Sequence, residues 1–283
     1  MQYCKLSLII LGLIMLSVTG NANPTRIDTG KTYKLVWADE FDTNGPPDAH
    51  NWKFEKGFVR NHELQWYQPQ NAWCKNGLLI IEAQKVHTPN PGYDSAATSW
   101  KKQRRFIEYT SSSINTAGLH AWQYGRFVMR AKIDTNIGLW PAFWMLGVSG
   151  QWPSNGEIDI MEYYRGKILA NVACGTATPY KAQWFSNTKT IRSFNDPLWA
   201  SKFHMWRMDW DEKGISLYID DLLMNHTDLS QLVNKDGTDI NPFNQPQYIL
   251  LNLALGGDNG GDVSSTSFPK RFEIDYIRVY QKE

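Results

Sequence analysis

Three carboxylates stand close together in Glu157-Ile158-Asp159-Ile160-Met161-Glu162, a stretch predicted to form one short β-strand. Apolar and acidic residues alternate at its start, so one face of the strand is apolar and the other carries negative charge. Glu162 lies five residues after Glu157 and would point away from the acidic face of a regular strand. A β-bulge near Met161 would return it to that face, and bulges are common beside active sites.

Acidic residues on one face repel each other, so folding alone does not favour this arrangement. Crowded carboxylates push each other's pKa values apart, and a site can then hold a proton donor beside an ionised nucleophile. The alternative is a solvated edge strand with scattered acids. The tryptophan, glycine and proline residues on both sides of the stretch favour the catalytic interpretation.

Short alternating runs recur along the chain between turn residues. The run from Arg126 to Ile133 places apolar side chains on one face only, as an antiparallel sheet with one solvated face requires. No long amphipathic helix is predicted, and Asp228–Val233 is expected to form one or two helical turns. The pattern indicates an all-β sandwich, with strands expected at Leu78–Ala83, Ser112–Thr116, Arg126–Ile133, Phe143–Leu146, Glu157–Tyr163, His204–Trp210, Ile215–Ile219, Tyr248–Leu255 and Phe272–Tyr280.

Composition narrows the class of partner. The 29 basic and 28 acidic residues nearly cancel, so we expect no nucleic-acid partner and no membrane insertion. The chain has 13 Trp, 13 Tyr and 12 Phe, and flat rings with polar edges suit stacking on sugars. We therefore expect a monomer that binds an oligosaccharide or polysaccharide. No Cys or His cluster has the spacing of a zinc site.

Residues 1–22 match a signal peptide, with Lys5, an apolar run from Leu6 to Val18, and the small-residue site Gly20-Asn21-Ala22. The apolar run is too short for a transmembrane helix, although an uncleaved anchor is the alternative. We expect an exported protein, in the periplasm, at the cell surface or outside the cell. Residues 23–283 then form a single domain.

Cysteine usage leaves one question open. Cys4 precedes the apolar run and is not placed to be a lipoprotein cysteine. Cys74 and Cys174 remain after cleavage, and they could form a disulfide in an exported protein. Nothing in the sequence places them near each other.

Several other segments carry a resemblance to a known family. With the acidic strand they resemble glycoside hydrolase family 16, in its laminarinase-like branch, along nearly the whole chain after the signal peptide. The segments are Trp37-Ala38-Asp39-Glu40-Phe41, Asn61-His62-Glu63-Leu64-Gln65, Asn76-Gly77-Leu78-Leu79, Tyr124-Gly125-Arg126-Phe127, Trp140-Pro141-Ala142-Phe143-Trp144, Trp152-Pro153, Leu251-Asn252-Leu253-Ala254 and Asp275-Tyr276-Ile277-Arg278-Val279-Tyr280.

The resemblance implies a jelly-roll (concanavalin-like) β-sandwich with an open concave cleft. It also implies a retaining, endo-acting double displacement in that cleft. Glu157 is then the nucleophile, Glu162 the acid/base and Asp159 the residue that tunes their protonation. This chemistry needs no cofactor.

The resemblance also suggests residues that bind the sugar. Asn61 and Glu63 match a segment that lines the donor side of the cleft. Arg126 is either a cleft residue or an ordinary strand-face arginine. Asn252 is an amide within an apolar strand, and a cleft position would supply the partners that a buried amide needs. The candidates for stacking are Trp140, Trp144 and Trp152, with a core position as the equal alternative for Trp144.

Many members of the family hold a structural calcium ion on the convex face. Its ligands correspond to the backbone carbonyls of Glu40 and Gly77 and to the carboxylate of Asp275. Oxygen ligands suit calcium. The alternative is that Asp275 is an ordinary hydrogen-bonded strand residue.

Three departures from the family's pattern bear on the substrate. Thr178 stands where related β-glucanases have histidine, and Gly256–Gly261 lacks their tryptophan. The insert His87–Phe106 is expected to form a loop over one end of the cleft, and its basic run either is solvated or meets a sulfate or sialate.

The departures favour an internal β-galactosidic linkage of a keratan-type or mucin-type glycan. An endo-β-1,3- or β-1,3-1,4-glucanase is the alternative. Further alternatives are a non-catalytic sugar-binding sandwich, which has no reason to keep the three acids together, and a transglycosylase.

Overall fold

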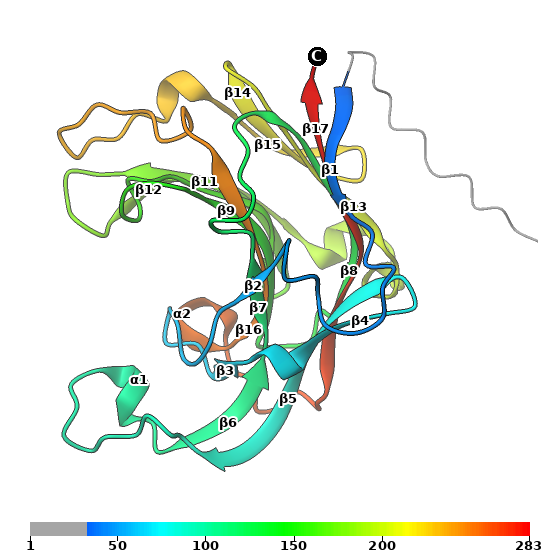
Figure 1. Cartoon of the computed structure of the whole chain (residues 1–283), viewed down its shortest axis with the longest axis vertical. Coiled ribbons are helices and arrows are strands. Elements are labelled where there is room, and N and C mark those ends of the chain that lie inside the picture. The colour runs from blue at the N-terminus through cyan, green and yellow to red at the C-terminus, as the bar shows by residue number, and fades with distance from the viewer. Residues whose placement is uncertain (1–32) are drawn as a thin grey trace, which may run out of the picture. The chain divides into compact units, whose positions relative to one another are not determined.

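Two β-sheets account for most of the secondary structure in residues 33–283, the part of the chain that this computed structural model describes (Figure 1). These residues form one compact unit. The predicted signal peptide, residues 1–22, lies outside the described residues. The all-β prediction is confirmed.

The inner sheet has seven strands, all antiparallel to their neighbours. In order across the sheet they are β12 (Ala182–Thr190), β11 (Lys167–Gly175), β10 (Glu157–Tyr164), β9 (Leu139–Gly147), β16 (Gln247–Leu255), β7 (Ser113–Asn115) and β2 (Lys53–Phe54).

The outer sheet has ten strands, and only the β3–β6 pair is parallel. Its main path is β15 (Leu222–Asp228), β14 (Gly214–Ile219), β13 (His204–Trp210), β8 (Gly125–Ile133), β17 (Lys270–Lys282), β5 (Leu78–Pro89), β6 (Phe106–Ser111) and β3 (Gln65–Tyr67). Off this path, β17 also pairs with β1 (Tyr33–Asp39), and β5 with β4 (Ala72–Lys75).

Helices are short. The α-helices are α1 (Trp100–Gln103) and α2 (Gly257–Gly260), and the 3₁₀ turns are η1 (Pro69–Asn71), η2 (Ile191–Phe194), η3 (Trp199–Ser201) and η4 (Leu229–Gln231). The helix expected at Asp228–Val233 is thus the single turn η4. Within residues 33–283, none of the helices has the length and apolar character needed to cross a membrane.

The core lies between the two sheets. Phe127 and Met129 of β8 and Phe143 and Met145 of β9 are fully buried in one apolar cluster. Burying a side chain of this size stabilises the fold by roughly 1.5–3 kcal/mol. Neighbouring residues in β8 and β9 point away from this cluster, so the opposite face of each strand is available for other roles.

The predicted bulge in β10 is confirmed. Pairing with both β9 and β11 shifts register between Asp159 and Glu162. Ile160 and Met161 therefore both enter the core, although they are consecutive. Tyr163 follows on the core side, and Glu162 is returned to the face that carries Glu157 and Asp159.

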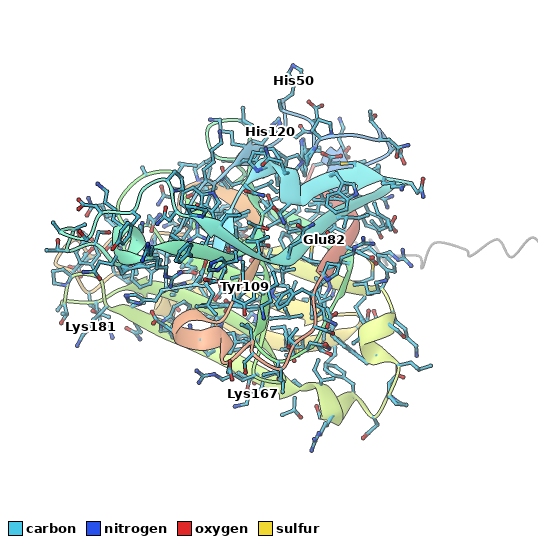
Figure 2. The ribbon with its side chains drawn as sticks, turned by 90° about the horizontal axis from the view of Figure 1, so that it is seen from below. His50, Glu82, Tyr109, His120, Lys167 and Lys181 are labelled. Carbon is cyan, nitrogen blue, oxygen red and sulfur yellow. The ribbon has the colours of Figure 1, made fainter. Side chains whose placement is uncertain are left out.

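Part of the aromatic content is structural. Near the start of the described chain, the ring centroid of Trp37 lies 6.0 Å from that of Trp52 and 5.1 Å from that of Trp122. His120 stacks on Trp122 at 5.9 Å, and its ring contacts the carbonyl oxygen of His50 at 3.2 Å, at the edge where Figure 2 labels both histidines. These rings pack β1 against its following loop.

Cys74 and Cys174, the cysteines of residues 33–283, are both buried, and neither forms a disulfide. Cys74 lies on β4 of the outer sheet and Cys174 on β11 of the inner sheet. The structure therefore contains no Cys74–Cys174 disulfide.

Candidate active site

A cavity of about 710 Å³ lies on the exposed face of the inner sheet, and we call it the cleft. It brings together residues that the sequence predicted from widely separated segments. Those that line it are Asn61, Glu63, Trp140, Trp144, Trp152, Glu157, Asp159, Glu162 and Asn252.

Two tryptophan indoles hold the two glutamates. The Nε1 of Trp152 donates to Oε2 of Glu157 at 2.5 Å, and the Nε1 of Trp140 donates to Oε1 of Glu162 at 2.7 Å. Trp140 is on β9, whereas Trp152 comes from the loop before β10. Each indole thereby fixes the orientation of one carboxyl group from a different element.

Asp159 lies between the glutamates and is hydrogen-bonded to both. Two carboxyl groups can share a hydrogen bond only if one is protonated. The pKa of Asp159 is raised well above its usual range by burial and by the two glutamate charges, so Asp159 carries a proton, and its single O–H donates to one glutamate at a time. Asn171, which pairs with Asp159 from the neighbouring strand β11, donates from Nδ2 to Asp159 and to Glu162, each at 3.0 Å. Asn171 thus connects the middle acid to the last one.

Burial is the main electrostatic effect in this group. It raises the pKa of Glu157 to about 7, with a further rise from the Glu162 charge that the Trp152 hydrogen bond opposes. Burial and then the two glutamate charges raise the pKa of Asp159 well above its usual range. Burial also raises the pKa of Glu162. The three acids therefore titrate as a coupled unit, in which Asp159 holds its proton most firmly.

The donor side predicted from the resemblance is a connected polar network. Buried Glu63 accepts hydrogen bonds from Gln65 at 2.7 Å, Tyr67 at 3.2 Å and Asn61 at 3.3 Å. Asn252 donates to the Tyr67 hydroxyl at 3.2 Å. The buried amide of Asn252 therefore has partners, as expected of a cleft position.

Trp144 combines both roles considered for it. It is 8% exposed and packs with Ala142 and Leu250 on the cleft side of the sheet. Its Nε1 donates to Asn252 at 2.7 Å, and the Arg60 guanidinium lies 5.0 Å from its ring centroid. The ring is therefore held firmly while its remaining surface lines the cleft.

Arg126 does not reach the cleft, so its prediction as a sugar-binding residue is wrong. It lies on β8 of the outer sheet, where the core-facing positions are taken by Phe127 and Met129. Its Nε and Nη2 donate to the Asp209 carboxylate at 2.6 and 2.9 Å. Arg126 is therefore an ordinary strand-face arginine, the alternative considered from the sequence.

The three predicted calcium ligands lie near one another along β17. Asp39 pairs with Ile277 and Leu79 with Ile274, so Glu40 and Gly77 approach Asp275 from two sides. The Asp275 carboxylate, however, forms an ion pair with Arg130. No group of three His, Cys, Asp or Glu side chains in residues 33–283 is arranged to hold a metal ion. An ion here would compete with Arg130 for the Asp275 carboxylate.

The departures from the family pattern have different positions. Asn259, in the loop without tryptophan, lines the cleft. Thr178 does not line it; Thr178 lies in a neighbouring hollow of about 260 Å³. We call this the side hollow, and Trp152, Ser154, Thr176, Thr178, Tyr180 and Asp236 are among its lining residues.

The insert supports the cleft instead of covering it. Its loop carries α1 and extends away from the sheets in Figure 1, and none of the described residues 87–106 lines the cleft. Arg104 donates to the backbone carbonyls of His62 and Glu63 and lies 4.7 Å from the Trp100 ring centroid. Arg104 is thus a structural residue of the donor side.

Several residues that line the cleft were not predicted: Arg60, Tyr164, Asn171, Trp184, Ser186 and Asn259. Asn171 is on β11, which is buried at nearly every position and so shows no alternation. Trp184 is on β12, where most residues are at least partly exposed. The adjacent rings Trp184 and Phe185 in a mostly polar strand were the one available signal for Trp184.

A β-sandwich whose open cleft holds paired carboxyl groups beside tryptophan rings defines an endo-acting glycoside hydrolase. The model of glycosyl hydrolases family 16 matches residues 60–278, and the chain belongs to this family. The predicted resemblance is confirmed.

Relatives within the family differ in what they act on. The chain is 35% identical to a beta-glucanase of Rhodothermus marinus over 269 residues, 90% of this chain and 88% of that protein. It is similar to a laminarinase catalytic domain from Thermotoga maritima, with a TM-score of 0.74 and 31% sequence identity. The match covers 89% of this chain and 99% of that domain. It is also similar to a structure from work on endo-acting O-glycanases with which human gut bacteria initiate mucin breakdown. Here the TM-score is 0.81 and the sequence identity 31%, and the match covers 92% of this chain and 94% of that one.

Glu157→Gln should change how stability depends on pH. Because burial raises the Glu157 pKa from 4.5 to about 7, its contribution to stability is fully present below about pH 4.5 and is lost as pH rises through about 7. Glutamine does not ionise. The variant should therefore melt above the unchanged protein at alkaline pH, and the difference should close at acid pH. A difference in melting temperature between the two proteins that stays the same across this pH range would contradict the raised pKa.

Calcium remains a prediction, tested by thermal melting in chelator. A bound ion stabilises only the folded state, so its removal should lower the melting temperature and leave room-temperature activity intact. If Arg130 is instead the permanent partner of Asp275, chelator leaves the melting curve unchanged.

Proposed function

We propose that this protein is a retaining endo-glycosidase that cleaves internal β-galactosidic linkages of keratan-type or mucin-type glycans. One observation supports the reaction above all: the bulge places Glu157, Asp159 and Glu162 on one wall of the cleft with fixed hydrogen-bond partners. A module that only binds sugar gains nothing from the cost of burying these charges.

In the proposed reaction, ionised Glu157 attacks the anomeric carbon, and Glu162 donates its proton to the departing oxygen. Asp159 keeps a proton between the glutamates and stabilises the charge on Glu157 through its hydrogen bond. In the second step Glu162 accepts a proton from water, which attacks the glycosyl–Glu157 ester. The configuration at the anomeric carbon is retained.

Galactoside specificity is supported by the wall of the cleft. Galactose differs from glucose in an axial O4, which needs room and a polar partner. The Gly256–Gly261 loop has small residues and presents Asn259 to the cleft. The higher TM-score with the O-glycanase structure agrees with this proposal.

Glucan cleavage is the second candidate. The 35% identity to a beta-glucanase favours it, as does the similarity to the laminarinase domain. Thr178 no longer argues against it, because this residue lies outside the cleft.

Export to the periplasm, the cell surface or the extracellular space is part of the proposal. It is supported only by the sequence of residues 1–22, and N-terminal sequencing of the exported protein would test it.

Glu157→Gln and Glu162→Gln should each lower kcat by on the order of 1,000-fold or more, because each removes one partner of the double displacement. Azide should partly restore activity to Glu157→Ala and give a product of inverted configuration, since it enters on the side of the missing nucleophile. Arg126→Met is the matched control and should keep kcat. Full activity in either glutamine variant would exclude the assigned roles.

Product analysis on laminarin, barley glucan, agarose, keratan and mucin glycans tests the substrate. We expect kcat/KM for a β-galactosidic linkage to exceed that for laminarin by at least about tenfold, because a site built around one hydroxyl discriminates strongly. A preference of about a hundredfold for laminarin or barley glucan would establish the glucanase alternative.

A further inference from the structure

Exposed aromatic rings gather at one end of the cleft. Four aromatic residues are among the exposed large apolar side chains of residues 33–283, namely Tyr93, Trp152, Tyr180 and Trp184. Of these, Trp152 and Trp184 line the cleft, and Trp152 and Tyr180 line the side hollow. Exposed rings concentrated in this way indicate a binding surface.

Tyr180 is not held in place by burial. It is 70% exposed, yet its backbone has a φ of 60°, which is uncommon for a bulky residue. Lys181, which follows it, lies at the periphery of the molecule in Figure 2. A turn closed by the hydrogen bond from the Lys181 N–H to the Thr178 carbonyl holds this conformation, so the backbone fixes where the exposed ring lies.

The side hollow lies beside the cleft, off the path of a linear sugar chain. Across the inner sheet, Glu157 pairs with Ala173 and Ala173 with Trp184, so a linear sugar chain continuing along the cleft passes Trp184. The side hollow is formed instead by the loops before β10 and before β12, together with Asp236 from the loop between η4 and β16. Trp152 lines both cavities and bonds to Glu157. The side hollow therefore adjoins the position of a sugar bound beside Glu157.

The lining of the side hollow selects the chemistry of this group. It has no Lys or Arg among the described residues, and Asp236 is its charged member. Hydrogen bonds from Ser154 and Thr238 lower the pKa of Asp236, so the carboxylate stays ionised. An anion would be repelled there, whereas a neutral sugar offers hydroxyl donors and a face for Tyr180. A volume of about 260 Å³ equals roughly nine water molecules, enough for one sugar ring.

We infer that the side hollow is a subsite for a neutral monosaccharide branch carried by the sugar bound beside Glu157, with Tyr180 as its stacking residue. This inference rests on the proposed glycosidase function and adds that branched chains are substrates.

The test compares kcat/KM on three oligosaccharides with the same scissile linkage: linear, with a neutral branch next to that linkage, and with a sulfated branch. Substrates are built on the backbone that the enzyme cleaves, galactoside or glucan. Tyr180→Ala should lower kcat/KM on the neutral branched substrate about fivefold and leave the linear one unchanged. Thr178→His, which fills the hollow, should act in the same direction. Tyr93→Ala is the matched control, an exposed aromatic residue of the β5–β6 loop.

Cleavage of the neutral branched substrate at least as fast as the linear one, with slower cleavage of the sulfated one, supports the inference. Equal losses on linear and branched substrates in Tyr180→Ala, or no cleavage next to a neutral branch by the unchanged enzyme, would overturn it. A preference for glucan backbones defeats the proposed substrate but leaves this comparison intact, so the two failures are distinguishable. Unchanged melting temperatures show that the variants are folded.

Discussion

The bulge in β10 is the constraint on which the candidate active site depends. A regular strand would bury Glu162 in the apolar core, where an unpaired carboxyl group is strongly unfavourable. Because of the bulge, Met161 joins Ile160 in facing the core, so the strand adds one apolar side chain to the core and presents three acids to the cleft. The same distortion therefore serves the packing of the sandwich and the chemistry of its open face.

Holding these acids together requires compensation from the surrounding sheet. Burial raises the pKa of each one, and the charges of the glutamates raise that of Asp159 further. Donors from separate strands and a loop oppose this, through Trp140, Trp152 and Asn171. The balance leaves protons within the group near neutral pH, as acid catalysis beside an ionised nucleophile requires.

Tryptophan serves two purposes in this molecule. Trp206 and Trp210 of β13 are almost completely buried and fill the space between the sheets. Trp140 and Trp152 use their indole N–H groups to orient carboxylates while their rings line the cleft. The second use ties sugar binding to catalysis, because displacing Trp152 would disturb both a wall of the cleft and the Glu157 carboxylate.

The local pattern of the sequence was sufficient to predict the sandwich and the acidic strand. Alternation predicted β8, β10 and β13, and the spacing of Glu157, Asp159 and Glu162 predicted the bulge, because side-chain direction along a strand depends only on neighbouring residues.

Alternation shows that a strand has a polar face, but it does not show which sheet that face belongs to. Arg126 was therefore ambiguous until β8 was seen in the outer sheet. Asn171 and Trp184 reach the cleft through the registers Asp159–Asn171 and Ala173–Trp184. Only the pairing of strands distant in the chain decides such contacts, so they belong to the tertiary structure alone.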